Sequence, residues 1–309
     1  MKTEHPVLTQ VRRGIAANRR PGLHFPGFFL DLETVNVGEG GSHLVMPYGE
    51  YCADASGDMN IGAIALLADL GTGASMRVHL PHTSRMATAT MQLHFTGERV
   101  RSDLECVGRF DGFFQGAAAI QGRVSGELTA DGKTVAHASA SFATPAPPPG
   151  VTIHPVPWAC MGREHEVPSL TMAEMSDDEK RVMKAARAAL NKATAERSFI
   201  QHLWGQVATH RQGGGASNTV TIGPHIGNRV GHVQGGVIFG IAAATAIASL
   251  PRASLLTSAS AWYISPGTGT RLKVRSSVLQ SGKTIAVVRT DVTADDGRLV
   301  LAMMTSHTF

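Results

Sequence analysis

The two halves of this 309-residue chain repeat one order of predicted elements, and this repeat constrains the fold more than any other feature. Each half begins with a helix, continues with one or two strands, and reaches a glycine-containing turn that leads into a helix apolar on nearly all sides. The predicted ranges are 8–18, 27–35, 43–47 and 60–69 in the first half, and 177–204, 218–222 and 234–243 in the second. A helix that is apolar all round is expected to be buried, so the pattern predicts a duplicated α+β unit.

Matching turn chemistry closes both halves. Three or more strands follow each buried helix, and the last two are joined by an Asp-Gly turn, at Asp131-Gly132 and at Asp296-Gly297. Asp-Gly between β-rich segments is a strong hairpin signal. An alternating strand then ends at Phe142 in the first half and at Phe309 in the second.

A proline-rich segment separates the halves. Residues 145–157 contain six prolines and are expected to be extended, while Ser176 and Glu179 form a capping box that should start the next helix. We therefore expect an N-terminal domain at 1–145, a linker at 146–175 and a C-terminal domain at 176–309. At ~3.3 Å per residue the linker could reach on the order of 100 Å, enough to cross a domain.

Composition narrows the class of protein. The apolar fraction of 43% is too high for a disordered chain. The 28 basic and 24 acidic residues give a formal net charge of +4. Basic residues are scattered and aromatic residues make up only 6%, so nucleic-acid binding is not expected. Cys52, Cys106 and Cys160 lie far apart, which predicts neither a disulfide framework nor a metal site.

No targeting or membrane segment is expected. The first residues carry charges without an apolar core, and the longest helix-compatible apolar run, 237–250, has 14 residues. That run is too short to span a bilayer, so a cytoplasmic protein without a membrane partner is predicted.

The buried helices and their turns resemble a known fold. A Gly235-Gly236 turn opening a buried helix, antiparallel strands, and a Tyr263-x-x-Pro266 element are similar to the hotdog fold, and within it to PaaI-like acyl-CoA thioesterases. The resemblance covers about 27–143 and 217–309. It implies two hotdog domains in tandem, each an antiparallel sheet wrapping a central helix, forming an internal pseudo-dimer.

The family pattern, an Asn, a His-Gly-Gly turn and an Asp on the helix that follows, is incomplete in each half. The second half keeps the Asn as Asn228, has Gln234 in place of His, and has Ala243 at the acidic helix position. The first half has the acid, Asp69, but the other equivalent positions are Asp54, Asn60, Ile61 and Gly62.

The resemblance implies composite sites, each built from both halves. One combines Asn228 and Gly235 of the second half with Asp69 and Thr88 of the first, and is nearly complete. The equivalent site would contain Asp54, Ile61, Ala243 and Leu256 and should be inactive. One active and one degenerate site per chain are therefore expected.

The chemistry of the nearly complete site suits thioester hydrolysis. The Gly235 amide, at the positive end of a helix, could stabilise the charge that develops on a thioester oxygen. Asp69 would act as base or nucleophile, Thr88 would orient the water, and Asn228 would hold the base, water or acyl group. Candidate substrate-binding residues are Gln234, Gly236, His232 and Asn60. Coenzyme A would be present only as part of the substrate, so no separate cofactor is expected.

Each of these residues also has a structural interpretation. Asp69 could end its helix, the two glycines could serve packing alone, and Asn228 could be a left-handed turn residue. Thr88 could be an ordinary strand residue. His232 and Gln234 could satisfy backbone groups around the turn.

Two other functions stay open. The segment 56–61 is faintly similar to the hydratase motif of another hotdog branch, although the required His is missing, so hydratase, dehydratase or isomerase activity on an acyl-CoA stays open. Loss of motif residues is also compatible with an acyl-CoA-binding protein without activity. The partner in every case is a small-molecule acyl-CoA, and the family suggests a homodimer of double-hotdog chains. Arg271, Lys273 and Arg275 alternate on one strand and could meet phosphates or simply face solvent.

Overall fold

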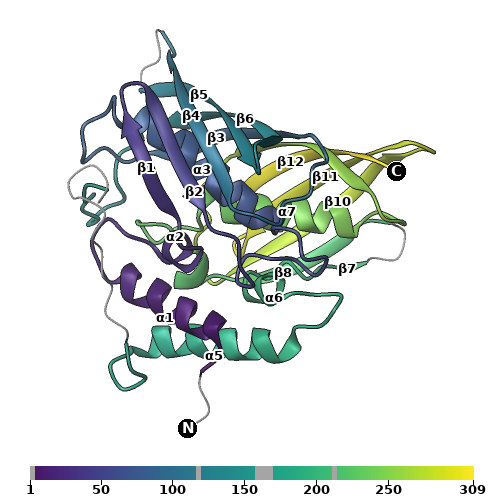
Figure 1. Cartoon of the computed structure of the whole chain (residues 1–309), viewed down its shortest axis with the longest axis horizontal. Coiled ribbons are helices and arrows are strands. Elements are labelled where there is room, and N and C mark those ends of the chain that lie inside the picture. Colours follow the sequence, from purple (N-terminus) through teal and green to yellow (C-terminus); the bar gives the residue numbers. More distant parts are fainter. Residues whose placement is uncertain (1–3, 116–119, 157–169, 211–213) are drawn as a thin grey trace.

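Residues 4–115, 120–156, 170–210 and 214–309 are described by a computed structural model, and their strands form a single twelve-stranded antiparallel sheet (Figure 1). The first half contributes α1 (Pro6–Asn18), α2 (Phe25–Phe29), β1 (Glu33–Gly38), β2 (Gly41–Met46), α3 (Ile61–Arg77), β3 (Ala87–Phe95), β4 (Leu104–Phe113), β5 (Gln121–Ala130) and β6 (Lys133–Ala143). The second half contributes α5 (Asp177–Lys192), α6 (Phe199–Leu203), β7 (Thr209–His210), β8 (Ala216–Thr221), the 3-10 turn η1 (Pro224–Ile226), α7 (Gly235–Ala248), β9 (Leu255–Tyr263), β10 (Arg271–Ser281), β11 (Ile285–Ala294) and β12 (Leu299–Thr308).

The strand order confirms the repeat. From the outer edge inward the first half runs β1-β2-β4-β5-β6-β3, and the second half runs β7-β8-β10-β11-β12-β9. The halves join where β3 pairs with β9, from Thr90 opposite Trp262 to His94 opposite Ser258. Both predicted hairpins are present, β5–β6 and β11–β12, with Gly132 and Gly297 at positive φ. The α+β duplication is therefore confirmed.

The two apolar helices lie on one face of the sheet and against each other (Figure 1). Glycines allow their backbones to approach: a methyl group at Gly236 would lie 2.5 Å from the Ala65 carbonyl oxygen, and one at Gly240 would overlap Cα of Gly62. Helices that cross this closely exclude a Cβ at the contact. The α3–α7 contact fixes where the N-terminus of α7 meets the middle of α3.

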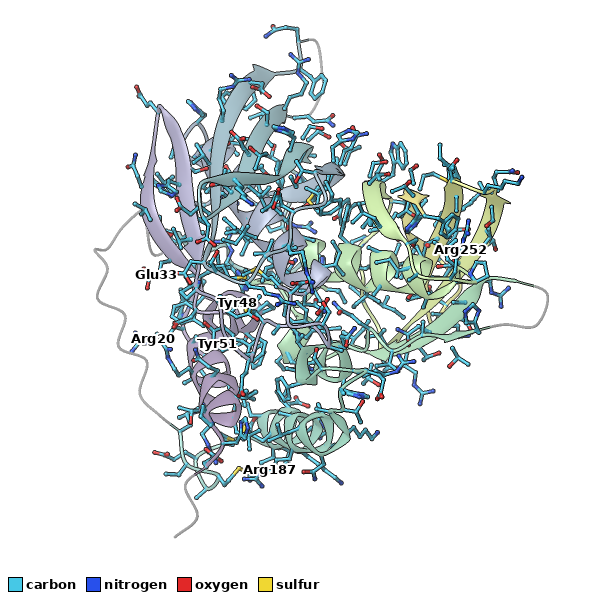
Figure 2. The ribbon with its side chains drawn as sticks, turned by 45° about the vertical axis from the view of Figure 1, so that its right-hand side comes forward. Arg20, Glu33, Tyr48, Tyr51, Arg187 and Arg252 are labelled. Atoms are coloured by element: carbon cyan, nitrogen blue, oxygen red, sulfur yellow. The ribbon has the colours of Figure 1, made fainter. Side chains whose placement is uncertain are left out.

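Helices α1, α2, α5 and α6 form a second layer below the sheet (Figure 1). Arg19, which follows the last residue of α1, pairs with Glu179 of α5 at 2.6 Å, and Ser176 and Glu179 form the predicted capping box. Tyr48 and Tyr51, labelled in Figure 2, follow β2; the Tyr51 ring lies edge-on to Phe29 of α2, with centroids 6.2 Å apart, whereas the Tyr48 hydroxyl donates to the Gly57 carbonyl.

Two predicted elements differ in the structure. Residues 27–35 were expected to be a strand, but a short helix, Phe25–Phe29, occupies the start of that range and β1 begins only at Glu33. His24 accepts the Gly27 amide and Pro26 lies in the first turn, which favours a helix start over a strand. The helix predicted over 177–204 is broken after Lys192, and a new helix begins beyond Ser198, whose amide donates to the Gln201 side chain.

The described part of the connector, residues 146–156 and 170–175, contains neither helix nor strand. The division at residues 145 and 176 stays a prediction, because both halves share one sheet. Cys52 and Cys106 are buried free thiols, and Cys160 lies outside the described residues. Within the described ranges no helix is long and apolar enough to span a membrane, and no group of side chains there could hold a metal ion.

Candidate active site

A cavity of about 1100 Å³ opens between the two halves. Its lining includes Asp69 and Gly73 of α3, Thr88 of β3, and Gly235 of α7. Its apolar part comes from strands β1, β2 and β6 and from α3, while residues after β9 and part of the connector complete it. This volume is large enough for a sizeable organic ligand.

Asp69 lies at the centre of the predicted site. Its Oδ1 accepts a hydrogen bond from Thr88 Oγ1 at 2.8 Å, and its Oδ2 accepts from Gln234 Nε2 at 2.6 Å and from the Gly236 amide at 3.2 Å. The side chain belongs to the first half, and two of its three donors belong to the second. The structure thus brings Asp69, Thr88 and the start of α7 together across the two halves.

Burial determines the acidity of Asp69. The residue is only 5% exposed, and burial raises the pKa of its carboxyl to about 6 although three hydrogen bonds lower it. Helix α3 continues for two turns beyond it to Arg77, so the interpretation of Asp69 as a helix terminus is wrong. A carboxyl group with a pKa near 6 is ionised at neutral pH and is a stronger base than an exposed aspartate.

Gly235 is the first residue of α7 and faces the same space. Its amide has no acceptor among the described residues, while its carbonyl accepts a hydrogen bond from Tyr263 Oη at 2.9 Å. A methyl group at this position would lie 2.8 Å from Asp69 Oδ2 and 2.9 Å from Thr88 Oγ1. The missing side chain thus leaves room beside the carboxylate, next to an unpaired amide at the positive end of a helix.

Gln234 has two contacts at once. Its Oε1 caps α7 by accepting the Val237 amide at 2.9 Å, and its Nε2 donates to Asp69. Gln234 thus links the first turn of α7 to the carboxylate of α3. Gly236 contributes its amide to Asp69 and its missing side chain to the α3–α7 packing.

Asn228 lines the cavity but is engaged in its own loop. Its Oδ1 accepts the amides of Val230 and His232, both at 3.0 Å, and no hydrogen bond among the described residues joins it to Asp69. Its φ is not positive, so the left-handed interpretation is wrong. His232 also lines the cavity, with Nδ1 3.4 Å from Arg85, and burial lowers its pKa.

Asn60 does not line the cavity. It caps α3, accepting the Gly62 amide at 2.8 Å and donating to Gln206 Oε1 at 2.7 Å. The other members of the expected degenerate site, Asp54, Ile61, Ala243 and Leu256, also lie outside the cavity lining.

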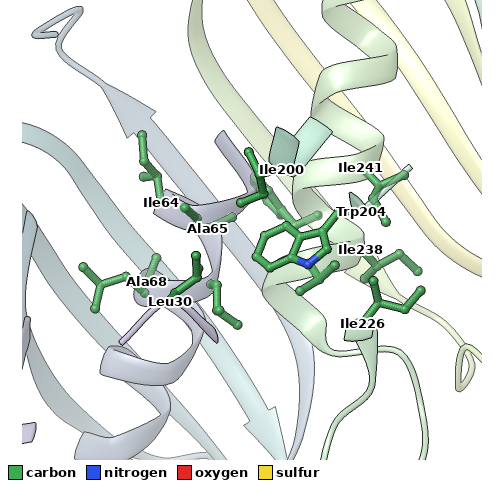
Figure 3. Packing of buried hydrophobic residues seen from close by; sticks show 14 of the residues in the cluster. Leu30, Ile64, Ala65, Ala68, Ile200, Trp204, Ile226, Ile238 and Ile241 are labelled. Carbon is green, nitrogen blue, oxygen red and sulfur yellow. The ribbon is translucent and has the colours of Figure 1, made fainter. Parts of the chain in front are cut away.

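Trp204 fills space at this second position. It is fully buried between α3 and α7, beside Ala65 and Ile238 (Figure 3). A methyl group at Gly62, the counterpart of Gly236, would lie 3.1 Å from the Trp204 ring and would overlap the side-chain amide of Gln206. Side chains thus occupy the region equivalent to the open site.

Sequence reasoning missed most of the cavity lining, including Tyr263 and three of its arginines. Tyr263 appeared only as part of a motif, and Arg77, Arg85 and Arg229 were not singled out at all. Arg77 could have been identified from the sequence as a candidate site residue, because Asp69 and Arg77 are the charged residues of an otherwise uncharged helix. Arg85 and Arg229 lie in loops, where sequence alone does not indicate which cavity they border.

Comparisons with known proteins agree with this architecture. Residues 225–308 match the family model of the acyl-CoA thioesterase N-terminal domain. No curated protein matches the chain. A TesB protein from Mycobacterium avium subspecies paratuberculosis is 15% identical, with 90% of this chain and 95% of that one covered and a TM-score of 0.53.

Two further structures have similar extents. One described as a putative oleoyl thioesterase from Lactobacillus plantarum is 11% identical, covering 86% of this chain and 95% of that one, with a TM-score of 0.54. A protein of unknown function with a hotdog fold from Alicyclobacillus acidocaldarius is 8% identical, covering 99% and 98%, with a TM-score of 0.51. At these identities the likeness concerns the fold, and the narrower PaaI-like assignment stays a prediction. The chain has a tandem hotdog fold, and residues 225–308 of its second half match the model of an acyl-CoA thioesterase domain.

Proposed function

We propose that this protein hydrolyses an acyl-CoA thioester at the composite site between its two halves. The observation that carries the proposal is the buried Asp69 carboxylate, held by Thr88, Gln234 and the Gly236 amide beside the unpaired Gly235 amide. A base and a hydrogen-bond donor for an oxyanion thus border the same space. The family match of residues 225–308 supports the same reaction class.

The proposed reaction uses Asp69 as the base for a water molecule. The water gives a proton to Asp69 while its oxygen attacks the thioester carbonyl carbon, and the carbonyl oxygen accepts a hydrogen bond from Gly235. Collapse of the intermediate breaks the carbon–sulfur bond, and the Asp69 proton goes to the sulfur, which releases free coenzyme A and the acid. Direct attack by Asp69 is the alternative within the same site.

The neighbouring side chains have positioning roles. Thr88 and Gln234 use both carboxylate oxygens and so fix the plane of Asp69. Tyr263 holds the first turn of α7 by donating to the Gly235 carbonyl. His232 is a candidate contact for the substrate at the cavity wall, whereas the geometry favours structural roles for Asn228 and Asn60.

The hydratase alternative has less support. Asp58, the acid of the 56–61 segment, forms ion pairs with Arg99 at 2.9 Å and Arg101 at 2.8 Å and does not line the cavity. Hydration would therefore have to use Asp69 as well.

A thiol-release assay across acyl-CoAs of different shape tests the proposal. Release of free coenzyme A by the wild type, lowered by orders of magnitude in Asp69→Asn, is the expected result. Loss of enoyl absorbance without free thiol would indicate hydration instead, and tight binding without any product would indicate a binding protein. We further propose that the halves act as an internal pseudo-dimer and that two chains associate, which the molar mass in solution would test.

A further inference from the structure

Four arginines line the cavity in addition to the proposed catalytic residues: Arg13, which pairs with Asp31, and Arg77, Arg85 and Arg229. Arg77 is the last residue of α3 and is only 4% exposed, while Arg85 and Arg229 are half-buried. A guanidinium is almost never fully buried without a partner of opposite charge. A buried Arg77 is therefore expected to have an anionic partner.

The protein supplies no such anion within the described residues. None of their ion pairs includes Arg77 or Arg229; the hydrogen bonds of these two go to backbone carbonyls, from Arg77 to Ser84 and from Arg229 to His154. The carboxylates of the cavity wall are engaged or exposed: Asp31 pairs with Arg13 at 3.0 Å, Asp69 is held as described above, and Glu33 is exposed.

The two arginines also act on each other. Burial, and then the positive charge of Arg229, lower the pKa of Arg77 to about 10. Both side chains are thus positively charged at neutral pH, although they are close enough to repel and lie where water solvates them poorly. An anion bound between the two guanidinium groups would offset both their mutual repulsion and their loss of solvation.

We propose that Arg77 and Arg229 bind a carboxylate at the far end of the acyl group, so that the preferred substrates are ω-carboxyacyl-CoA thioesters. This inference rests on the proposed thioesterase function. It assigns to the same cavity a specificity for a charged end of the acyl chain, through charge-assisted hydrogen bonds that a guanidinium makes well with a carboxylate.

The surface between the two ends supports this assignment. Asp69 and Arg77 are two turns apart on α3, about 12 Å along the helix axis at 1.5 Å per residue. Leu70, Gly73 and Ala74 lie between them and face the same cavity. The cavity wall therefore runs from a base, along an apolar stretch suited to methylene groups, to a buried cation.

Phosphates of coenzyme A are the other source of negative charge. At 4% exposure, however, Arg77 leaves little room for a nucleotide, which is bulky and well solvated. A slender acyl chain that ends in a carboxylate can reach such a buried group more easily.

The test compares pairs of acyl-CoAs of equal length, one ending in a carboxylate and one in a methyl group, by thiol release. We expect the wild type to prefer the carboxylate member in kcat/KM. Arg229→Gln should reduce that preference about tenfold or more, since a hydrogen bond to a charged group is worth roughly that factor. Arg77→Lys, which retains the charge, should retain part of the preference. Arg109→Gln, at an exposed position of β4 where the arginine pairs with Asp111, is the control and should leave the preference unchanged.

Several outcomes separate this inference from the function on which it rests. Hydrolysis of both members at equal rates would overturn the carboxylate preference and leave the thioesterase function intact. An equal loss for both members in Arg229→Gln, with weaker binding of free coenzyme A, would assign the arginines to phosphate and also overturn it. If no thioester is hydrolysed, calorimetric binding of the two members to wild type and Arg229→Gln still decides, because only the carboxylate member should lose affinity.

Discussion

Replacing Asp69 by Asn should make the protein more stable and at the same time inactive. Burial raises the pKa of Asp69 from 3.8 to about 6, so the folded protein holds its proton more tightly than the unfolded chain does. A tenfold change in proton affinity corresponds to about 1.4 kcal/mol, so keeping this carboxylate ionised in the fold costs about 3 kcal/mol at pH 8. An asparagine has no charge to bury and removes this cost.

The asparagine can also keep the hydrogen bonds. Its Oδ1 can take the place of the Asp69 oxygen that accepts from Gln234 and the Gly236 amide, and its Nδ2 can donate to the Thr88 hydroxyl, which then acts as acceptor. No buried polar group is left unpaired, so the gain in stability is not offset by a lost contact.

The sign of the pH dependence follows from the two pKa values. Below about 3.8 the carboxyl is protonated in both states and contributes no difference. As the pH rises from 3.8 to about 6, only the unfolded chain loses the proton, so the wild type is progressively destabilised. The advantage of Asp69→Asn should therefore be about 3 kcal/mol at pH 8 and roughly half of that at pH 5.

Urea denaturation of both proteins at pH 5 and pH 8 measures this difference, and thiol release measures the activity. A variant that is no more stable than the wild type at pH 8, or whose advantage does not grow with pH, would show that burial does not raise the pKa of Asp69. Retained hydrolysis in the variant would instead refute the assignment of Asp69 as the base.

Three further predictions concern the surroundings of this carboxylate and the second site. Gly235→Ala should lower kcat/KM at least tenfold in the thiol-release assay with little change in unfolding temperature, because the added methyl meets only the ends of two side chains, at 2.8 and 2.9 Å. Thr88→Val removes a donor that lowers the pKa of Asp69, so the acidic limb of the pH–rate profile, near pH 6 in the wild type, should move to higher pH. Trp204→Ala should cost about 3–5 kcal/mol in urea denaturation, because a fully buried indole is lost between α3 and α7.

Each of these has a contrasting outcome. Gly236→Ala is the matched control for Gly235→Ala, because its methyl meets the backbone of Ala65 and Leu66 and should destabilise the fold as well. Full activity in Gly235→Ala would show that the reaction does not need the open space beside Asp69. An unmoved pH profile in Thr88→Val would place the titration on another group, and a loss below 1 kcal/mol in Trp204→Ala would mean that the second region is not tightly packed.

The fold was predictable wherever the sequence pattern is long and periodic. The two apolar helices and the Asp-Gly hairpins repeat clearly enough that α3, α7, β5–β6 and β11–β12 could be placed from residue types alone. The strand expected over 27–35 failed because Phe25–Phe29 is a short apolar run, for which periodicity does not separate strand from helix. In this segment the cap formed by His24 and the position of Pro26 in the first turn favour a helix.

The candidate site was predictable only through the repeat. The meeting of Asp69, Thr88 and Gly235 follows from superimposing the halves on one family pattern, and the structure brings the three together. The partnership of Gln234 with Asp69 could not be predicted, because it depends on where one helix start lies against the middle of another helix. Arg229 was missed for the same reason.

Two kinds of glycine at the helix starts show how the halves diverged. Gly236 and its counterpart Gly62 are present in both halves, and in both a Cβ would collide with the opposite segment. At Gly236 the collision is with the backbone of α3, and at Gly62 it is with the Trp204 ring and Gln206. Packing against backbone therefore requires glycine at Gly236, whereas at Gly62 an added methyl would meet side chains.

Residue 235, which precedes Gly236, is not conserved between the two halves. Gly235 has Ile61 as its counterpart, so a large side chain is tolerated at one helix start and absent at the other. This difference corresponds to a difference in the residue that faces each position from the other half. Gly235 faces the carboxylate of Asp69, whereas the residue equivalent to Asp69 in the second half is Ala243. If packing alone required Gly235, its counterpart should have been kept as Gly62 was. The loss of glycine only where the acid is also lost is what hydrolysis at a single site predicts, because an open space beside the helix start is useful only next to a base.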